Sequence, residues 1–352
     1  MSLLFVESFD HFVTADIYKK WTSPGYGGGT TGGAIVAAEG RCGSQALFFN
    51  VIDGATKGIT VGAGATASKG FAGFAYHAVT AFAANPLFTV VQGSNLQWTL
   101  SRELSGALSV TNFGGSVQVS SVADVVRTGS YSYIEVSWTQ STTVGAITIR
   151  VNNTVVATAT NIRTTSVFFP ATTWDAITLS NTNNASGYFD DVYVCDDFDD
   201  GLLPATNGFL GDLRVEYLRP TADGANTDWT VVGGGTQANA VDKNAASNLT
   251  TPSVTSTVVG DLITNAYADP SVASGSCFGV QISALAVKDS SGPATIGAVV
   301  RHGGTDATAA AQGLSVTTSS YCVTTLQRNP VTAVGWTLAQ VAADEYGLEH
   351  VT

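Results

Sequence analysis

The chain has 352 residues, which suffices for about two domains and for a core that needs no disulfide or metal to hold it together. It contains 27 acidic and 15 basic residues, and the net charge of −12 argues against nucleic acid and anionic membrane surfaces, because both are bound through basic patches. Only 12% of the residues are charged, about half the usual share of ~25%, so small polar and apolar side chains must fill much of the surface. No apolar run reaches the roughly 18 residues of a membrane span, and the first twelve residues lack the basic start of a secretion signal.

Apolar and polar residues alternate through most of the first half, which is typical of half-buried antiparallel strands. Asn152 and Asn153 tolerate positive φ, so we expect a two-residue turn that joins two strands into a hairpin. Many short strands separated by Gly- and Ser-rich turns predict a sandwich or a barrel. The strands predicted here are Leu3–Phe9, Gln45–Val51, Phe71–Ala78, Leu87–Val91, Leu96–Leu100, Leu108–Thr111, Tyr133–Trp138, Ala146–Val151, Thr154–Thr158, Ala176–Ser180 and Tyr188–Val194.

A change of composition at residues 196–211 predicts a domain boundary, because an acidic stretch is followed there by a polar, turn-rich one that contains Pro204. We therefore predict a domain over residues 1–198, a linker over 199–211 and a second β-rich domain over 212–352. The second half is expected to contain a turn-rich region from Thr221 to Thr257 and strands at Leu213–Leu218, Phe278–Val287, Thr295–Arg301, Gly313–Thr317 and Tyr321–Leu326.

One helix is predicted near the C-terminus. Thr337 and Gln340 fit the T-x-x-Q pattern of a capping box, which marks the start of a helix. Gly347 is expected to end this helix, and a short strand, Leu348–Val351, to follow it. The residues expected on the buried face of the helix are Leu338, Val341, Ala342 and Tyr346.

The four cysteines, Cys42, Cys195, Cys277 and Cys322, lie far apart and favour buried free thiols over a disulfide framework. Residues 275–279 have the spacing of a nucleophile elbow around Cys277, with His302 as the only histidine of that region. An elbow needs a helix after the nucleophile, and a strand-like pattern follows here instead. Residues 27–32 match G-x-G-x-x-G, but their flanks favour a flexible loop over a phosphate site. No two histidines have the spacing of a zinc site.

Six aspartates lie within eleven residues, which suggests a calcium site as one interpretation and a solvated, mutually repelling edge as the other. We favour the second, since no calcium-loop pattern is present, and we predict no metal and no cofactor. The weak metal candidates are Asp190, Asp191, Asp196 and Asp197; Asp199 and Asp200 complete the cluster.

Tyr131, Tyr133 and Glu135 alternate on one strand, so a carboxylate stands beside two aromatic rings. Such a face is a weak candidate for a sugar-binding platform, and ordinary solvent-facing strand residues are the alternative. Glycoside cleavage would need two carboxylates in one cleft. Because glutamate is scarce, we assign no catalytic residue and expect a protein that is not an enzyme.

The first half resembles the concanavalin/laminin-G-like jelly roll. The segments that support this resemblance are an aromatic-led strand, Tyr131–Val136, a strand and turn, Gly145–Asn153, and a closing strand with paired aspartates, Tyr188–Val194. The resemblance implies a jelly-roll β-sandwich at residues 1–198, and the alternation in the second half suggests a second sandwich-like domain with one C-terminal helix.

The second half is similar to virion proteins of tailed bacteriophages. The similarity lies in Asn207–Val215, Leu218–Trp229, Val299–Gly304 and Gly335–Thr337. It implies a non-enzymatic structural component of the virion, either a capsid decoration protein or head fibre or a tail protein, made in the cytoplasm of the bacterial host. The alternative is a carbohydrate-binding receptor-recognition protein on the virion surface. The partners expected are copies of the same chain, for example in a trimer, phage capsid or tail proteins and, in the alternative, a host surface glycan.

Overall fold

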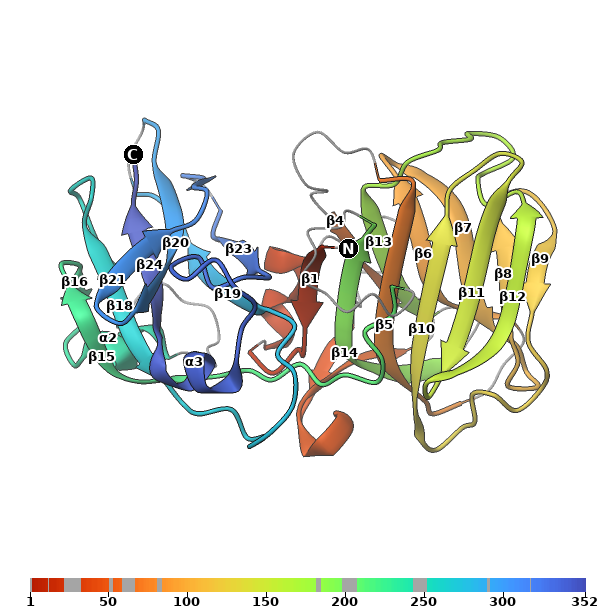
Figure 1. The fold of residues 1–352 in the computed structure, drawn as a ribbon, viewed down its shortest axis with the longest axis horizontal. Coiled ribbons are helices and arrows are strands. Elements are labelled where there is room, and N and C mark those ends of the chain that lie inside the picture. Colours follow the sequence, from red (N-terminus) through yellow and green to blue (C-terminus); the bar gives the residue numbers. More distant parts are fainter. Residues whose placement is uncertain are drawn as a thin grey trace. The chain divides into compact units, whose positions relative to one another are not determined.

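The computed structural model describes residues 2–11, 13–21, 33–50, 53–58, 67–80, 84–181, 185–197, 208–242, 252–289, 292–316 and 318–352. The chain divides into two compact units, Met1–Val215 and Glu216–Thr352, and each has its own sheets (Figure 1). The second domain was expected to begin at residue 212, whereas residues 208–215 belong with the first unit. Residues 199–207 of the predicted linker lie outside the described residues.

The first unit is a sandwich of two antiparallel sheets, as the jelly-roll expectation required, and the predicted all-β fold class is confirmed. The larger sheet has the order β12–β11–β10–β5–β14–β3–β2, with β1 paired to β14. Its strands are β1 (Leu3–Glu7), β2 (Ala34–Val36), β3 (Ala46–Asn50), β5 (Lys69–Ala78), β10 (Tyr131–Thr139), β11 (Gly145–Val151), β12 (Thr154–Ile162) and β14 (Ser186–Asp196).

The smaller sheet has the order β4–β13–β6–β7–β8–β9. Short helical turns lie before β2 and β3. The strands of this sheet and the helical turns are β4 (Asp53–Gly58), β6 (Asn85–Gln92), β7 (Asn95–Arg102), β8 (Leu108–Asn112), β9 (Val117–Ser120), β13 (Ala176–Asn181), η1 (Thr14–Asp16), α1 (Ile17–Lys20) and η2 (Arg41–Gly43).

Aromatic side chains fill the space between the two sheets. Trp138 of β10 lies with its ring centroid 5.5 Å from that of Trp98 on β7 and 5.1 Å from that of Trp174. Phe74 of β5 stacks on Phe88 of β6 at 5.9 Å. Because each such ring removes a large apolar area from water, this cluster fixes which face of each sheet points inward. The opposite face of the larger sheet is left for other contacts.

The predicted hairpin is confirmed. Asn152 and Asn153 have φ angles of 48° and 66° and join β11 to β12. Two consecutive residues with positive φ match the right-handed twist of the strands on either side.

The second unit is also built mainly of antiparallel strands. Its main sheet has the order β15–β18–β24–β20–β21, with β22 paired to β20, and two further sheets pair β16 with β17 and β19 with β23. The elements are β15 (Pro220–Thr227), β16 (Thr230–Val232), α2 (Gln237–Val241), β17 (Ser253–Thr255), β18 (Leu262–Tyr267), β19 (Val280–Ala286), β20 (Thr295–His302), β21 (Thr305–Thr308), β22 (Gln312–Gly313), β23 (Ser320–Leu326), α3 (Leu338–Ala343) and β24 (Glu345–His350).

The capping box of α3 is confirmed. The Thr337 hydroxyl accepts the backbone N–H of Gln340, and the Gln340 side chain accepts the backbone N–H of Thr337. The helix is shorter than predicted, because Asp344 is extended and β24 begins at Glu345. Tyr346 and the glycine after it are therefore strand residues, and Tyr346 packs with Trp336 in the core of this unit.

Three other expectations for this half were wrong. Residues Leu213–Leu218 form no strand. The region expected to consist of turns, Thr221–Thr257, contains β15, β16, β17 and α2. A second helix is therefore present besides the predicted one. Of the strand expected at Gly313–Thr317 only Gly313 is a strand residue, as the end of β22, and Thr317 lies outside the described residues.

The four cysteines are free thiols, as expected. Cys195 and Cys322 are buried and Cys277 is partly buried, but Cys42 is exposed, because it occupies the outward η2 turn with a φ of 66°. Among the described residues, no helix is long and apolar enough to cross a membrane.

We predict that the first proteolytic cut falls in residues 199–207. The sequence there is acidic and turn-rich, whereas residues 209–215 are bonded to the first unit as described below. Brief digestion with proteinase K, followed by intact-mass analysis, should give two stable fragments. A chain that resists cleavage there while it is cut inside either unit would contradict the boundary.

Candidate functional site

The outer face of the larger sheet carries both sets of residues that the sequence singled out. Tyr131, Tyr133 and Glu135 lie on the face of β10 opposite the core. The register pairs these three residues with His77, Ala75 and Gly73 of β5 in turn. The next strand, β14, continues the rows with Tyr188, Asp190 and Tyr193. Side chains of the outer face therefore form successive rows across the sheet.

The first row consists of four aromatic rings on four adjacent strands. Tyr131 of β10, His77 of β5, Tyr188 of β14 and Phe48 of β3 are paired in register. Neighbouring ring centroids lie 5.2, 5.6 and 4.9 Å apart, in that order. All four side chains are partly exposed. This aromatic row extends about 15 Å at the usual spacing of strands.

The aromatic row bears no net charge at neutral pH. Burial lowers the pKa of His77, although the nearby charge of Glu39 opposes this, so the imidazole is neutral. Tyr131 donates its hydroxyl proton to the backbone carbonyl of Glu39 at 2.7 Å, which fixes the ring. Burial raises the pKa of Tyr131 further above its ordinary value. A neutral row of rings presents the surface on which C–H-rich faces of a ligand stack.

Glu135, two rows away, is buried and held by hydrogen bonds to one oxygen and an ion pair at the other. Its Oε1 accepts the hydroxyl of Tyr193 at 2.7 Å and the backbone N–H of Gly211 at 2.8 Å. Its Oε2 lies 3.4 Å from Nη1 of Arg150. Gly73, between Glu135 and Tyr193 in the register, makes this possible, because a Cβ there would lie 2.2 Å from the Tyr193 ring.

Arg41 forms the second polar centre on this face. Its guanidinium lies 3.5 Å from Asp191 and 2.5 Å from Asp212, and Nη1 also donates to the carbonyl of Leu213 at 3.1 Å. The same group stacks over the ring of Tyr133, 5.2 Å from its centroid. Asp191 in turn accepts the backbone N–H of Val215 at 2.7 Å.

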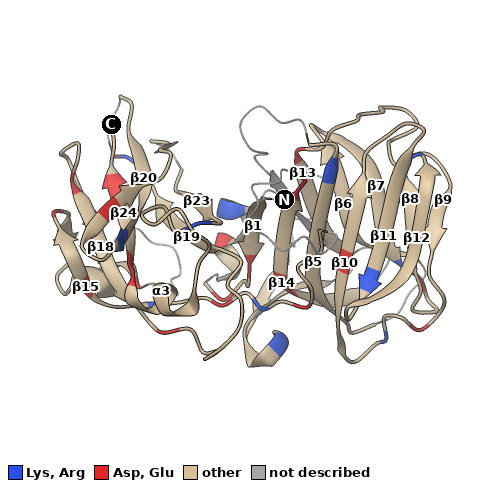
Figure 2. Cartoon of the chain, in the orientation of Figure 1, with Lys and Arg blue, Asp and Glu red and all other residues tan. Residues whose placement is uncertain are grey.

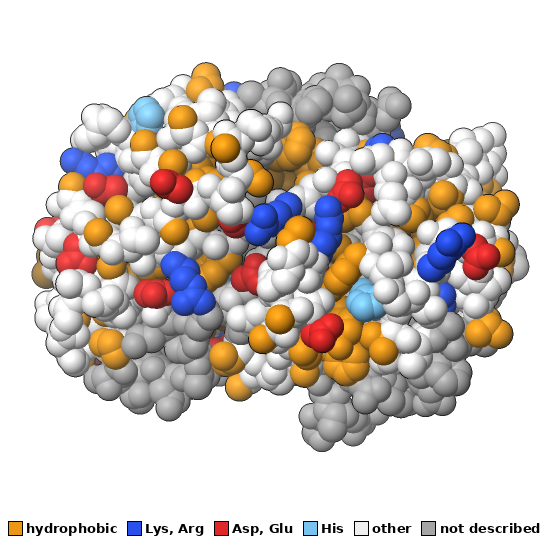
Figure 3. Space-filling model, turned by 90° about the horizontal axis from the view of Figure 1, so that it is seen from below, with side chains coloured by type: hydrophobic (Ala, Val, Ile, Leu, Met, Phe, Trp, Pro, Cys, Tyr) orange, Lys and Arg blue, Asp and Glu red, His pale blue; other side chains and the backbone are white. Residues whose placement is uncertain are grey.

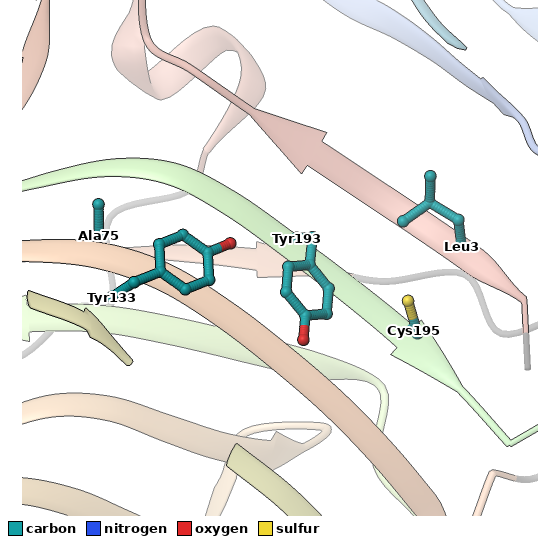
Figure 4. Close-up of a cluster of buried hydrophobic side chains, with 5 residues drawn as sticks. All are labelled: Leu3, Ala75, Tyr133, Tyr193 and Cys195. Atoms are coloured by element: carbon teal, nitrogen blue, oxygen red, sulfur yellow. The ribbon is translucent and has the colours of Figure 1, made fainter. Parts of the chain in front are cut away.

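Residues 209–215, the 209–215 segment from here on, therefore lie across the outer face and are held by both polar centres. Leu210 and Leu213 pack on the apolar cluster of Figure 4, and Phe209 lies 4.9 Å from the Arg150 guanidinium. Figure 4 shows the five buried members of that cluster, Leu3, Ala75, Tyr133, Tyr193 and Cys195.

The expected platform of Tyr131, Tyr133 and Glu135 is thereby corrected. Tyr133 is 2% exposed and Glu135 1% exposed, because the 209–215 segment covers them, and Tyr131 alone of the three remains partly open. The solvent-facing alternative fails for the same reason. Sequence reasoning missed His77, Tyr188 and Phe48, which complete the aromatic row, and only the strand register could have revealed them.

Half of the aspartate cluster is not a solvated edge, since Asp190, Asp191 and Asp196 lie buried in β14. Asp190 accepts the backbone N–H groups of Arg41 and Asp191 and the hydroxyl of Ser44, at 2.8–3.0 Å. Asp196 is also buried and accepts the backbone N–H of Ser2 at 3.0 Å. Of the other cluster members, Asp197 is exposed, and Asp199 and Asp200 lie outside the described residues.

These carboxylates do not converge on a point where an ion could sit. Within the described ranges, no group of three or more His, Cys, Asp or Glu side chains has the arrangement of a metal site. The donors that contact Asp190 and Asp191 are N–H and O–H groups of the protein. The geometry therefore assigns the two side chains to holding η2 and the 209–215 segment against β14.

The Asp190–Asp191 pair is nevertheless poorly solvated. Burial is the main cause that raises the pKa of each carboxyl, and the negative charge of Asp191 raises that of Asp190 further. Arg41 and the N–H of Val215 act in the opposite direction on Asp191. The folded state therefore retains a proton that the unfolded chain would release.

The elbow-like residues of the second unit do not form a nucleophilic centre. Burial raises the pKa of Cys277, which leaves it a thiol, and β19 rather than a helix follows it. His302 places Nδ1 2.6 Å from Asp344, and the other oxygen of Asp344 accepts the side-chain amide of Asn329 at 2.7 Å. These contacts join the end of β20 to the loops before α3 and β24. Residues 27–32, the G-x-G-x-x-G match, lie outside the described residues.

No protein-family model matches the sequence, and no curated protein matches it. Solved structures share its fold at low identity. The globular domain of calreticulin from T. cruzi is 7% identical, with 56% of this chain and 89% of that chain covered and a TM-score of 0.39.

Two further structures are similar to the same degree. Domain 4 of AbnA, a GH43 extracellular arabinanase from Geobacillus stearothermophilus solved with arabinotriose, is 13% identical and covers 55% of this chain and 92% of its own, with a TM-score of 0.38. A carbohydrate esterase from the Shiga toxin-encoding bacteriophage phi24B is 13% identical, with 55% and 97% covered and a TM-score of 0.37. The strand order of the first unit itself shows a mostly β, concanavalin-like sandwich, and the likeness to these structures concerns the fold alone.

We predict that Glu135→Gln lowers the free energy of unfolding of the first unit by about 2–4 kcal/mol. The amide removes the negative charge beside Arg150, and its NH₂ group then faces one of the groups that donate to Glu135 in the wild type. Urea unfolding followed by intrinsic fluorescence measures this loss. Asp197→Asn makes the same change at an exposed side chain and should have no measurable effect. Equal stability of the two variants would show that Glu135 does not hold the 209–215 segment.

A second prediction concerns pH. A carboxyl with a raised folded pKa binds its proton more tightly in the folded than in the unfolded state, so stability falls as pH rises above the ordinary value near 4. Between pH 5 and pH 8, the free energy of unfolding should therefore fall less in Asp190→Asn than in the wild type. The difference between the two losses should be on the order of 1–3 kcal/mol.

Melting curves at several pH values test this slope. The difference between variant and wild type cancels the opposite contribution of His11, whose pKa is lowered to about 4 chiefly by burial. Asp197→Asn is again the matched control. If Asp190→Asn and wild type lose stability in parallel over this range, the raised pKa is refuted.

Proposed function

We propose that the chain is a non-enzymatic structural component of a tailed-phage virion, in the capsid exterior or the tail, and that it acts through protein–protein contacts. The sequence similarity of the second half to virion proteins supports the setting. The mode of action is supported by one observation on the first unit. The surface around β8, β9 and β12, at one edge of the sandwich, is uncharged and apolar.

Exposed apolar side chains concentrate in that region. Among the described residues of the first unit, nine of the ten large hydrophobic side chains that are exposed lie between residues 104 and 169. Figure 2 draws β8, β9 and β12 almost wholly without charged residues. In Figure 3, hydrophobic side chains (orange) reach the surface among charged ones (red and blue) on the face shown. A monomer normally avoids such a surface, because mixed charges prevent association.

The most prominent apolar group is held in a fixed conformation. Phe168 and Phe169 are 65% and 56% exposed. The buried Ser166 hydroxyl accepts the backbone N–H groups of both, at 3.1 and 3.0 Å, and the Ser166 N–H donates to Gln97. Phe168 also lies edge-to-face against Phe113. Exposed rings held rigidly lose little entropy on binding, which is the property of interface hot spots.

The proposal predicts that this chain buries about 1,200–2,000 Å² or more against its neighbours in the particle. Localising the chain in a reconstruction of the intact virion tests this. Phe168→Ser/Phe169→Ser should reduce incorporation at least tenfold, whereas Val79→Ser, at the one exposed large apolar side chain among the described residues of this unit outside residues 104–169, should not. Contacts below ~800 Å² in the virion, or absence from the particle, would contradict the proposal.

Carbohydrate binding is the second candidate, and the aromatic row supports it. Tyr131, His77, Tyr188 and Phe48 offer four neutral, partly exposed rings in line, which suits the apolar faces of sugar rings. A glycan array with the wild-type chain and with Tyr188→Ala tests this reading, and Phe168→Ala is the control with an intact row. Binding that survives Tyr188→Ala but is lost in the control would place a ligand elsewhere, and no binding at all would exclude the candidate.

A further inference from the structure

The strand β12 ends the larger sheet and pairs on one side only. Its partner is β11, and among the described residues no strand pairs with its other side. It is nine residues long, and five of its side chains are exposed: Thr154, Val155, Thr158, Thr160 and Asn161. In an antiparallel pair every second residue directs its N–H and C=O away from the partner, so β12 presents a row of open hydrogen-bonding groups.

The other edge strands of this unit are short or carry charged residues, whereas β12 is long and uncharged. β2 has three residues and β9 has four, and β1 has five and ends in Glu7. The sequence of β4 includes an aspartate and a lysine. β12 has no charged residue, no proline and no glycine. Proteins that remain monomeric block edges with charges, prolines, bulges or short strands, and the irregularities at Val156 and Asn161 leave residues 157–160 as the part of β12 that none of these blocks.

We propose that β12 is a self-association edge, at which β12 of a second copy of this chain pairs antiparallel about a twofold axis. Only two positions of β12, Val156 and Asn161, are skipped in the register with β11. Between them, residues 157–160 pair with β11 without interruption. A second copy offers the same open ladder, so one twofold contact satisfies both edges at once.

Charge favours a second copy as the occupant. The chain carries a net charge of −12, so two copies can meet closely only where acidic residues are absent. Residues 151–174 contain one charged residue, Arg163, and residues 104–123, which include β9 beside β12, contain none. The guanidinium of Arg163 donates to the carbonyl of Ser166 at 2.7 Å and is turned toward its own loop. Threonine side chains along the edge add cross-strand contacts at no cost in charge.

This inference rests on the proposed function only in assuming that the chain works through protein contacts, and it is tested on the isolated chain. A wild-type chain that does not self-associate but is incorporated normally into particles would refute the edge and leave the virion role standing. A dimer that is absent from virions would do the reverse.

The test compares Thr158→Lys/Thr160→Lys with Ala15→Lys/Ser94→Lys. Both pairs add two positive charges at exposed positions, and only the first adds them to β12. Sedimentation velocity over a concentration series should show a wild-type dimer, a control that dimerises equally and a β12 variant whose dissociation constant is at least tenfold higher. Circular dichroism and melting temperature confirm that each variant is folded.

Hydrogen exchange locates the contact. Amides of residues 157–160 should exchange more slowly in concentrated than in dilute wild-type protein, and the difference should vanish in the β12 variant. A wild-type chain that is monomeric at high concentration would overturn the proposal. So would an oligomer that the β12 lysines leave unchanged, because its contact would then lie on another surface.

Discussion

The buried carboxylate of Glu135 determines the arrangement of the outer face of the larger sheet. A carboxylate that is 1% exposed is costly unless charge and hydrogen bonds compensate it. Tyr193 reaches it across Gly73, Arg150 approaches from the next strand, and Gly211 supplies its backbone N–H. The last of these donors belongs to a segment 76 residues later in the chain, so the position of that segment is determined by a polar contact as much as by its leucines.

This contact divides the outer face into two parts with different properties. Where the 209–215 segment lies, Tyr133 and Glu135 are removed from solvent and serve the fold. One row further along the strands, Tyr131 and its three aromatic neighbours are outside the cover and remain partly exposed. A ligand on this face would therefore contact the aromatic rings and not the carboxylate of Glu135. This favours recognition by stacking over acid–base chemistry. The sequence had suggested the reverse, a carboxylate beside the rings.

Local rules predicted the elements that depend on local contacts. The hairpin at Asn152 and Asn153, the alternation of β10 and the capping box of α3 each involve residues only a few positions apart. The burial of Glu135 could not be predicted in this way, because the covering residues are distant in sequence. The period-two pattern of Leu213–Leu218 was misleading for a related reason. Its first residues make backbone hydrogen bonds with side chains and not with another strand: Val215 donates to Asp191 of β14, and the Leu213 carbonyl accepts from Arg41 of η2.

The buried polar centres also change what the composition says about the surface. Charged residues are few in the whole chain, and several of them are enclosed: Glu7, Asp16, Lys20, Arg102, Glu135, Asp190, Asp191, Asp196 and Asp344. The charge left on the outside is therefore smaller still, and the residues near β12 are almost devoid of it. A protein with so few surface charges remains separate from its neighbours only if its strand edges and apolar side chains are covered. In the described part of the first unit, the edge of β12 and the phenylalanines of the loop that follows it are uncovered. Association at that edge is therefore the simplest way to pair its backbone groups and to bury its apolar side chains.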